Sequence, residues 1–249
     1  LRAAAELTLD LCSQAVGAGY ILKDATPSNV LFDGPRPVFV DVLSFEKRDP
    51  SNPLWLGHGQ FIRSFLLPLL ALRELGWPLA AVQIRRDGWE PAQLHAAMSR
   101  LQRLRPGVFG AVTLPAWFER SKGTAARPGQ MRKSPEMAAA ILQSSLKSLR
   151  SQIRRAAPSL PASHWSRYTT TAAHYPPDDH ARKQEFVSKV LSDIQPKTVL
   201  DIGANTGTYS ALAARAGARV VSLDIDPAAV EALWQMAHRE NLAILPLVA

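Results

Sequence analysis

The residues best suited to chemistry lie near the end of the chain, where an acid precedes a turn of small residues. Asp201 is followed by Gly203, Asn205 and Gly207. Glycine lets a ligand approach the backbone without a Cβ in the way, and asparagine adopts a left-handed conformation at lower cost than most residues. The spacing D-x-G-x-N-x-G differs from the dinucleotide fingerprint G-x-G-x-x-G, and Asp201 would repel a pyrophosphate but attract a cation. The turn therefore predicts a site for a positively charged nucleoside without phosphate.

Two expected strands position this turn. Residues 198–202 are the first strand, which is apolar over 199–202 except for Asp201, and residues 219–223 are a second strand that ends in Asp224. A βαβ unit of this kind has its ligand crevice at the carboxyl ends of the strands. Asp224 would accept hydrogen bonds from both hydroxyls of a ribose, and a charged acceptor of this kind contributes about 1.5–3 kcal/mol. Asp226 is the weaker candidate for the same role.

These residues resemble the first motif of class I S-adenosylmethionine-dependent methyltransferases, acid-x-Gly-x-Gly-x-Gly, with Asn205 at the middle glycine. The resemblance covers about residues 178–249, and a purely structural βα unit or an NAD fold are the alternatives. It implies a Rossmann-like fold, S-adenosyl-L-methionine as cofactor, and a turn that faces the amino acid part of the cofactor. It also implies a set of cofactor-binding residues: Asp201, Gly203, Ala204, Asn205, Gly207, Asp224 and Ile225. Neither a catalytic residue nor the methyl acceptor is indicated.

The expected third strand, residues 242–248, is the last element of the sequence. In the methyltransferase family, the acid that binds the adenine amino group, the substrate-facing fourth strand and the rest of the sheet follow such a strand. Three strands would leave an open edge and an uncovered face. We therefore expect that this chain is a fragment that does not transfer methyl groups by itself, although its parent does.

A second arrangement lies near the N-terminus. Asp24 and Asn29 are five residues apart on a loop after a helix, and Asp41 follows twelve residues later at the end of a strand. In phosphotransferases, residues so spaced orient the hydroxyl nucleophile and hold Mg²⁺ on nucleotide phosphates. The segment resembles the catalytic segment of protein-kinase-like and aminoglycoside-kinase-like folds, with two departures. Leu22 stands in place of the usual His, and Val42-Leu43 in place of Phe-Gly.

Three interpretations of this segment stay open. It is a loop stabilised by its Asp and Asn side chains, a degenerate kinase-like module, or an active nucleotide-binding or phosphotransferase module. The wider stretch of residues 22–46 also resembles the N-terminal region of bacterial methyltransferases related to a nodulation protein. That second resemblance implies that both halves belong to one long bacterial protein.

The remaining pattern predicts an α/β chain in which a mostly helical α+β region precedes the start of a Rossmann-like sheet. A degenerate kinase-like fold is one of the interpretations of that first region. We expect three parts: residues 1–130, a helix and Pro-rich linker over 131–177, and the truncated methyltransferase domain over 178–249. Helices are expected over residues 2–17, 60–75, 91–104, 134–155 and 178–194. Strands are expected over residues 37–43, 198–202, 219–223 and 242–248, and residues 20–22 and 30–32 are short apolar runs around a loop.

Composition limits the class of protein. Hydrophobic residues make up 47% of the 249, enough for a core. The single cysteine, Cys12, excludes a disulfide framework, favours a reducing compartment and is expected to pack as a small apolar residue. The longest apolar run, residues 65–72, is too short for a membrane span, so we expect a cytoplasmic location. The histidines show no metal-ligand spacing, and no metal is expected.

The net charge of +8 leaves an anionic partner open. The methyl acceptor could be a small molecule or RNA, and a non-catalytic basic RNA-binding module is a further alternative to an enzyme. The oligomeric state is not indicated by the sequence.

Overall fold

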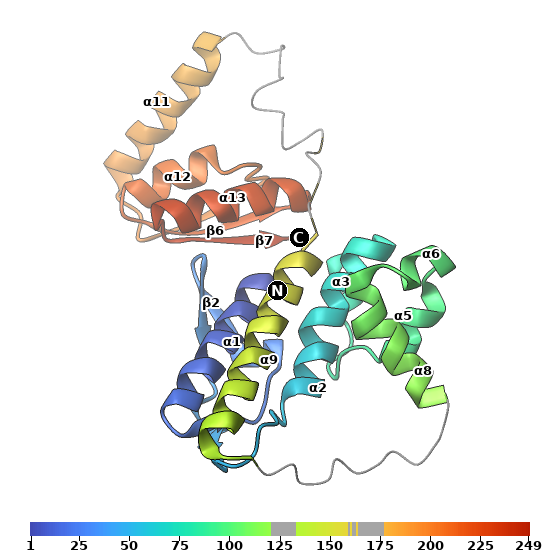
Figure 1. Cartoon of the computed structure of the whole chain (residues 1–249). Coiled ribbons are helices and arrows are strands. Elements are labelled where there is room, and N and C mark those ends of the chain that lie inside the picture. The colour runs from blue at the N-terminus through green and yellow to red at the C-terminus, as the bar shows by residue number, and fades with distance from the viewer. Residues whose placement is uncertain (121–132, 159, 161–162, 164–176) are drawn as a thin grey trace. The chain divides into compact units, whose positions relative to one another are not determined.

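The computed structural model describes residues 1–120, 133–158, 160, 163 and 177–249 (Figure 1). The chain forms two compact units. The N-terminal unit comprises Leu1–Leu31 and Val38–Ser159, and the C-terminal unit comprises Phe32–Pro37 and Leu160–Ala249. The polar and basic residues 119–133, with Gly and Pro among them, predict a loop, and most of it lies outside the described residues. Most of the Pro-rich linker expected before residue 177 lies outside them as well.

The N-terminal unit is mainly helical, with two pairs of short strands near its start. Strand β1 pairs antiparallel with β4, and β2 pairs with β3. The elements in chain order are α1 (Arg2–Gly17), β1 (Tyr20–Leu22), the 3₁₀ turn η1 (Pro27–Asn29), β2 (Val30–Asp33), β3 (Arg36–Phe39), the 3₁₀ turn η2 (Val42–Ser44), β4 (Phe45–Lys47), α2 (His58–Phe61), the π-helical turn η3 (Ile62–Leu66), α3 (Leu67–Leu75), α4 (Leu79–Gln83), α5 (Pro91–Ala97), α6 (Arg100–Arg103), α7 (Pro106–Val108), the π-helical turn η4 (Phe109–Thr113), α8 (Leu114–Arg120) and α9 (Pro135–Ala156).

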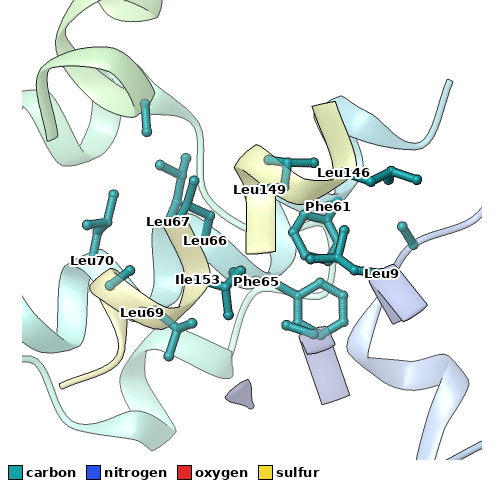
Figure 2. Packing of buried hydrophobic residues seen from close by; sticks show 14 of the residues in the cluster. Leu9, Phe61, Phe65, Leu66, Leu67, Leu69, Leu70, Leu146, Leu149 and Ile153 are labelled. Atoms are coloured by element: carbon teal, nitrogen blue, oxygen red, sulfur yellow. The ribbon is translucent and has the colours of Figure 1, made fainter. Parts of the chain in front are cut away.

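Helix α9 carries the apolar stripe around which this unit packs. Its N-terminus is capped as expected, because the backbone N–H of Met137 donates to Ser134 Oγ at 3.3 Å. Leu146, Leu149 and Ile153 are buried, and Figure 2 shows them among the leucine and phenylalanine side chains of α2, η3 and α3. The predicted helix is therefore confirmed, and so is the apolar stripe that the 4-3-4 spacing of Leu142, Leu146, Leu149 and Ile153 predicts.

Helix α1 packs beside α9 and covers the other side of this core (Figure 1). Cys12 is buried between apolar neighbours, as expected. Burial raises the pKa of its thiol to about 11, and a backbone hydrogen bond with Leu22 opposes part of this shift. Cys12 therefore acts as a packing residue of the core.

Two helices and one strand differ from the sequence predictions. The helix expected over 60–75 begins at His58 and contains the π-helical turn η3 in its middle. The helix expected over 91–104 is broken, because Ser99 caps a new helix: Ser99 N donates to Gln102 Oε1 at 2.8 Å and Gln102 N donates to Ser99 Oγ at 3.4 Å. The strand expected over 37–43 ends at Phe39, because the chain then turns through η2.

The C-terminal unit is a three-stranded parallel sheet with helices on one face (Figure 1). Its strands have the order β5-β6-β7, and the helices α12 and α13 are the crossovers between them. Right-handed crossovers in the same direction place successive helices on the same face. The elements are α11 (Pro177–Ile194), β5 (Thr198–Ile202), α12 (Thr208–Arg215), β6 (Arg219–Asp224), α13 (Pro227–Glu240) and β7 (Ile244–Val248).

The opposite face of this sheet is apolar and exposed in the described part of the chain. Leu200, Ile202 and Val221 are exposed on it, in agreement with the expected uncovered face. Helical periodicity over residues 178–194 predicts that Phe186, Val187, Val190, Leu191 and Ile194 face inward, and on α11 this prediction is only partly right. Leu191 is buried, whereas Phe186 and Ile194 are exposed. Helical periodicity placed them inward, but only part of the apolar face of α11 contacts α12.

We expect Ile153→Ala to lower the free energy of unfolding of the N-terminal unit by about 2–5 kcal/mol, because it leaves a cavity in a packed core. Chemical denaturation measures the effect. Ile141→Ala on the same helix is the matched control, since Ile141 is 41% exposed whereas Ile153 is 0% exposed. Equal losses for the two variants would contradict the assignment of the core to this face of α9.

Candidate cofactor site

The turn after β5 has the backbone that its residue types predict. Gly203, Asn205 and Gly207 all have positive φ, at 74°, 50° and 89°. A Cβ on Gly203 would meet no atom within 4 Å, so this part of the turn presents bare backbone to its surroundings. The interpretation of Asn205 as the residue that tolerates a left-handed conformation is confirmed.

A glycine at position 207 is expected to let the following helix lie close to the sheet, but the structure gives Gly207 a different packing partner. A Cβ on it would lie 2.0 Å from Cδ1 of Leu233, a buried residue of α13. The close approach is therefore to the neighbouring helix rather than to the sheet. With its positive φ, this contact gives two reasons for glycine at position 207.

Hydrogen bonds fasten the turn to the end of β6. The N–H groups of Gly203 and Ala204 donate to the Leu223 carbonyl oxygen at 2.9 and 3.0 Å. The N–H of Asn205 donates to Asp224 Oδ2 at 2.7 Å. The two strand ends and the turn thus form one rigid edge, in which Ala204 is buried.

Asp224 is held at both carboxylate oxygens. Oδ2 accepts from Asn205, and Oδ1 accepts from the N–H of Asp226 at 2.9 Å. A carboxylate has about four lone-pair sites, so Asp224 retains capacity for two further donors, such as ribose hydroxyls. Next to it, Ile225 is 75% exposed and offers an apolar surface at the same edge.

Asp226 is used in the fold itself. It caps α13, since Ala228 N donates to its Oδ1 at 3.0 Å, and Ser163 Oγ donates to its Oδ2. The residue is also buried. Asp224 is therefore better placed than Asp226 to contact a ligand.

A buried pair of serines holds Asp201, and the sequence analysis missed both. Ser210 Oγ donates to Asp201 Oδ2 at 2.5 Å and lies 2.8 Å from Ser222 Oγ. Ser210 and Ser222 are each fully buried. The signal was present in the sequence, because both are polar residues at inward positions of an otherwise apolar helix and strand. They fix the orientation of the Asp201 carboxylate at the start of the turn.

In the N-terminal unit, two of the three kinase-like candidates meet. Ser44 is buried and donates through Oγ to Asp41 Oδ2, while Asn29 Nδ2 donates to Ser44 Oγ at 3.4 Å. The loop that contains Asp24 is held from another side, since Ala25 N donates to Gln60 Oε1 at 2.7 Å. The structure thus joins Asn29 and Asp41 through a serine, and no hydrogen bond joins Asp24 to either of them among the residues that the structure describes.

Comparison with known proteins bears on the C-terminal unit first. Residues 200–248, which include the turn, Asp224 and the strands around them, match the methyltransferase domain family. The resemblance of the Asp201–Gly207 turn to class I enzymes is thereby confirmed.

A relative covers nearly the whole chain. Over 265 residues the chain is 29% identical to nodulation protein NoeA of Rhizobium meliloti (strain 1021), an alignment that covers 99% of this chain and 52% of NoeA. The chain thus spans about half the length of this curated relative, and its likeness to nodulation-protein relatives is confirmed. No solved structure matches the chain.

Two further findings concern metal binding and membrane insertion. In the parts of the chain that the structure describes, no group of three or more His, Cys, Asp or Glu side chains is arranged to hold a metal ion. No described helix has the length and apolar character needed to cross a bilayer.

We expect Gly207→Ala to destabilise the C-terminal unit by about 1–3 kcal/mol more than Gly217→Ala, because only the first substitution overpacks a neighbour. Both glycines have positive φ, but a Cβ on Gly217 would meet no atom within 4 Å. Hydrogen exchange of the amides of β5 and β6 measures the difference. Equal loss of protection in the two variants would contradict the contact with Leu233.

Proposed function

We propose that this chain carries part of the cofactor site of an S-adenosylmethionine-dependent methyltransferase. One observation carries the proposal: the Asp224 carboxylate ends β6 with both oxygens oriented by backbone N–H groups and with capacity for further donors. The methyltransferase domain match over the same residues supports it.

Each residue of the turn has a role in this proposal. Asp224 accepts the ribose hydroxyls, and the exposed side chain of Ile225 packs against the adenine ring. The bare backbone of Gly203 and the neighbouring Ala204 and Asn205 face the amino acid part of the cofactor. Gly207 keeps the turn against α13. Asp201, oriented by Ser210, contributes negative charge near a cationic ligand.

Methyl transfer requires little side-chain chemistry from the protein. S-adenosylmethionine supplies a methyl group that is already activated by a sulfonium, so the protein contributes alignment and exclusion of water. The acidic edge formed by Asp201 and Asp224 suits that positive charge and would disfavour the pyrophosphate of NAD. For the methyl acceptor we propose only a chemical class, which is a small molecule or an RNA. The net charge of +8 favours the RNA.

Calorimetric titration with S-adenosylhomocysteine tests the proposal. We expect Asp224→Ala to weaken binding about 10- to 100-fold, because the ribose loses a charged hydrogen-bond acceptor. Asp193→Asn is the matched control, since it removes one negative charge from an exposed position of α11 in the same unit. Affinity that is the same in wild type and Asp224→Ala would refute the ribose role.

A second candidate function rests on the N-terminal unit. The shared contact of Asn29 and Asp41 with Ser44 favours a nucleotide-binding or phosphotransfer module, in which these side chains would hold Mg²⁺ and Asp24 would orient a hydroxyl.

The second candidate predicts Mg²⁺-dependent ATP binding that is lost in Asp41→Ala, because Asp41 would be a ligand of the ion. Equilibrium dialysis with and without Mg²⁺ measures it. Glu46→Ala, at an exposed position of β4, is the control. ATP binding that is absent, or that is indifferent to Mg²⁺ and to Asp41, would leave the segment a structural loop.

A further inference from the structure

A cavity of about 370 Å³ opens in the N-terminal unit, beside the loop that follows Asp24. This volume lies within the usual range for small-molecule sites, about 300–1,000 Å³. Three segments build its walls. They contribute Pro27 and Ser28 from η1, Ser64 and Pro68 from η3 and α3, and Arg85 and Arg86 from the segment after α4.

Ser64 gives this cavity an unsatisfied polar group. The residue is only 5% exposed, and its hydroxyl has no hydrogen-bond partner among the residues that the structure describes. Buried hydroxyls are normally paired, because an unpaired one loses its bonds to water without replacement. Ser64 lies in the middle of η3, and π-helical turns of this kind occur frequently at functional sites.

The charge of the wall is positive. Arg85 and Arg86 both line the cavity, and the residues described as lining it include no acid. The guanidinium of Arg85 lies 5.2 Å from the ring centroid of Trp89, a cation–π contact that restricts the side chain. Guanidinium groups match the geometry of phosphate oxygens and bind them with two parallel hydrogen bonds.

The arginine segment is fastened to the same turn that carries Ser64. Trp89 N donates to the Arg63 carbonyl oxygen at 3.0 Å, and Trp89 Nε1 donates to the Val82 carbonyl oxygen at 2.8 Å. Gly88 has a φ of 77°, and a Cβ on it would lie 2.3 Å from the carbonyl oxygen of Arg63. The backbone of the segment that carries the two arginines is therefore tied to the turn that carries Ser64 before any ligand binds, which lowers the entropic cost of ordering that segment on binding.

We infer that this cavity binds a small phosphate monoester. Arg85 and Arg86 bind the phosphate, the hydroxyls of Ser28 and Ser64 donate to its oxygens, and the prolines contact the carbon part of the ligand. The inference concerns the N-terminal unit and does not depend on methyl transfer by the other unit. It also differs from the nucleotide hypothesis, because it does not use Asn29 or Asp41.

Calorimetry of the whole chain with glycerol 3-phosphate, inorganic phosphate and glycerol tests the inference. We expect both phosphates to bind at millimolar concentrations or below, glycerol not to bind, and Arg85→Gln/Arg86→Gln to weaken phosphate binding at least tenfold. The double variant Arg100→Gln/Lys147→Gln is the control, since it removes the same charge from exposed positions of the same unit. No binding of either phosphate, or equal losses in the two double variants, would overturn it.

Ser64→Ala separates a ligand role from a structural one. Because the hydroxyl has no partner among the residues that the structure describes, we expect the melting temperature of Ser64→Ala to be equal to or above that of wild type, while its affinity for glycerol 3-phosphate falls several-fold. A lower melting temperature with unchanged affinity would show that Ser64 serves the fold, and would overturn its assignment to the cavity.

Discussion

The attachment of the first turn to the end of β6 is the constraint on which the cofactor site depends. One carbonyl oxygen, that of Leu223, accepts from two successive N–H groups, and Asp224 accepts from the next one. These bonds are available only if the turn runs at positive φ, and that requirement explains the residue types at 203 and 205. They also orient the Asp224 carboxylate, so the backbone that shapes the turn is the same backbone that aims the proposed ribose acceptor.

Much of this unit could be predicted from the sequence because its signals are local. A few neighbouring positions are enough to recognise the alternating apolar strands, the turn of small residues and the acid at a strand end. Parallel pairing then brings the strand ends together. The partners of Asp201 were missed for the opposite reason. Ser210 lies on the following helix and Ser222 on the next strand, so their contact depends on packing. The prediction that Phe186 faces inward was wrong for a related reason. Periodicity shows which residues share a face of a helix, but not how much of that face a neighbouring element covers.

The N-terminal unit was harder to predict. The break at Ser99 depends on a reciprocal capping bond with Gln102, which competed with the helical periodicity of residues 91–104. The strand that was expected to reach residue 43 stops early because Asp41 and Ser44 turn the chain. That same turn brings Asp41 to Asn29, so the deviation from the expected strand creates the contact between the two candidate residues.

Buried serines connect these observations. Ser44 joins Asn29 to Asp41, Ser210 and Ser222 orient Asp201, and each of the three is fully buried with a partner. Ser64 is buried as well, yet it lacks a partner among the described residues and lines a cavity with two arginines. In an apolar interior, a hydroxyl is costly unless it bonds to another group. The positions of buried serines therefore indicate where polar groups are brought together.

The most direct test of the central claim is an amide NMR titration that follows the turn itself. The account predicts that S-adenosylhomocysteine shifts the backbone resonances of Gly203, Asn205 and Ile225 in a saturable manner, and that NADH at the same concentration does not. Resonances of the turn that stay unchanged with S-adenosylhomocysteine, or that respond to NADH instead, would contradict it.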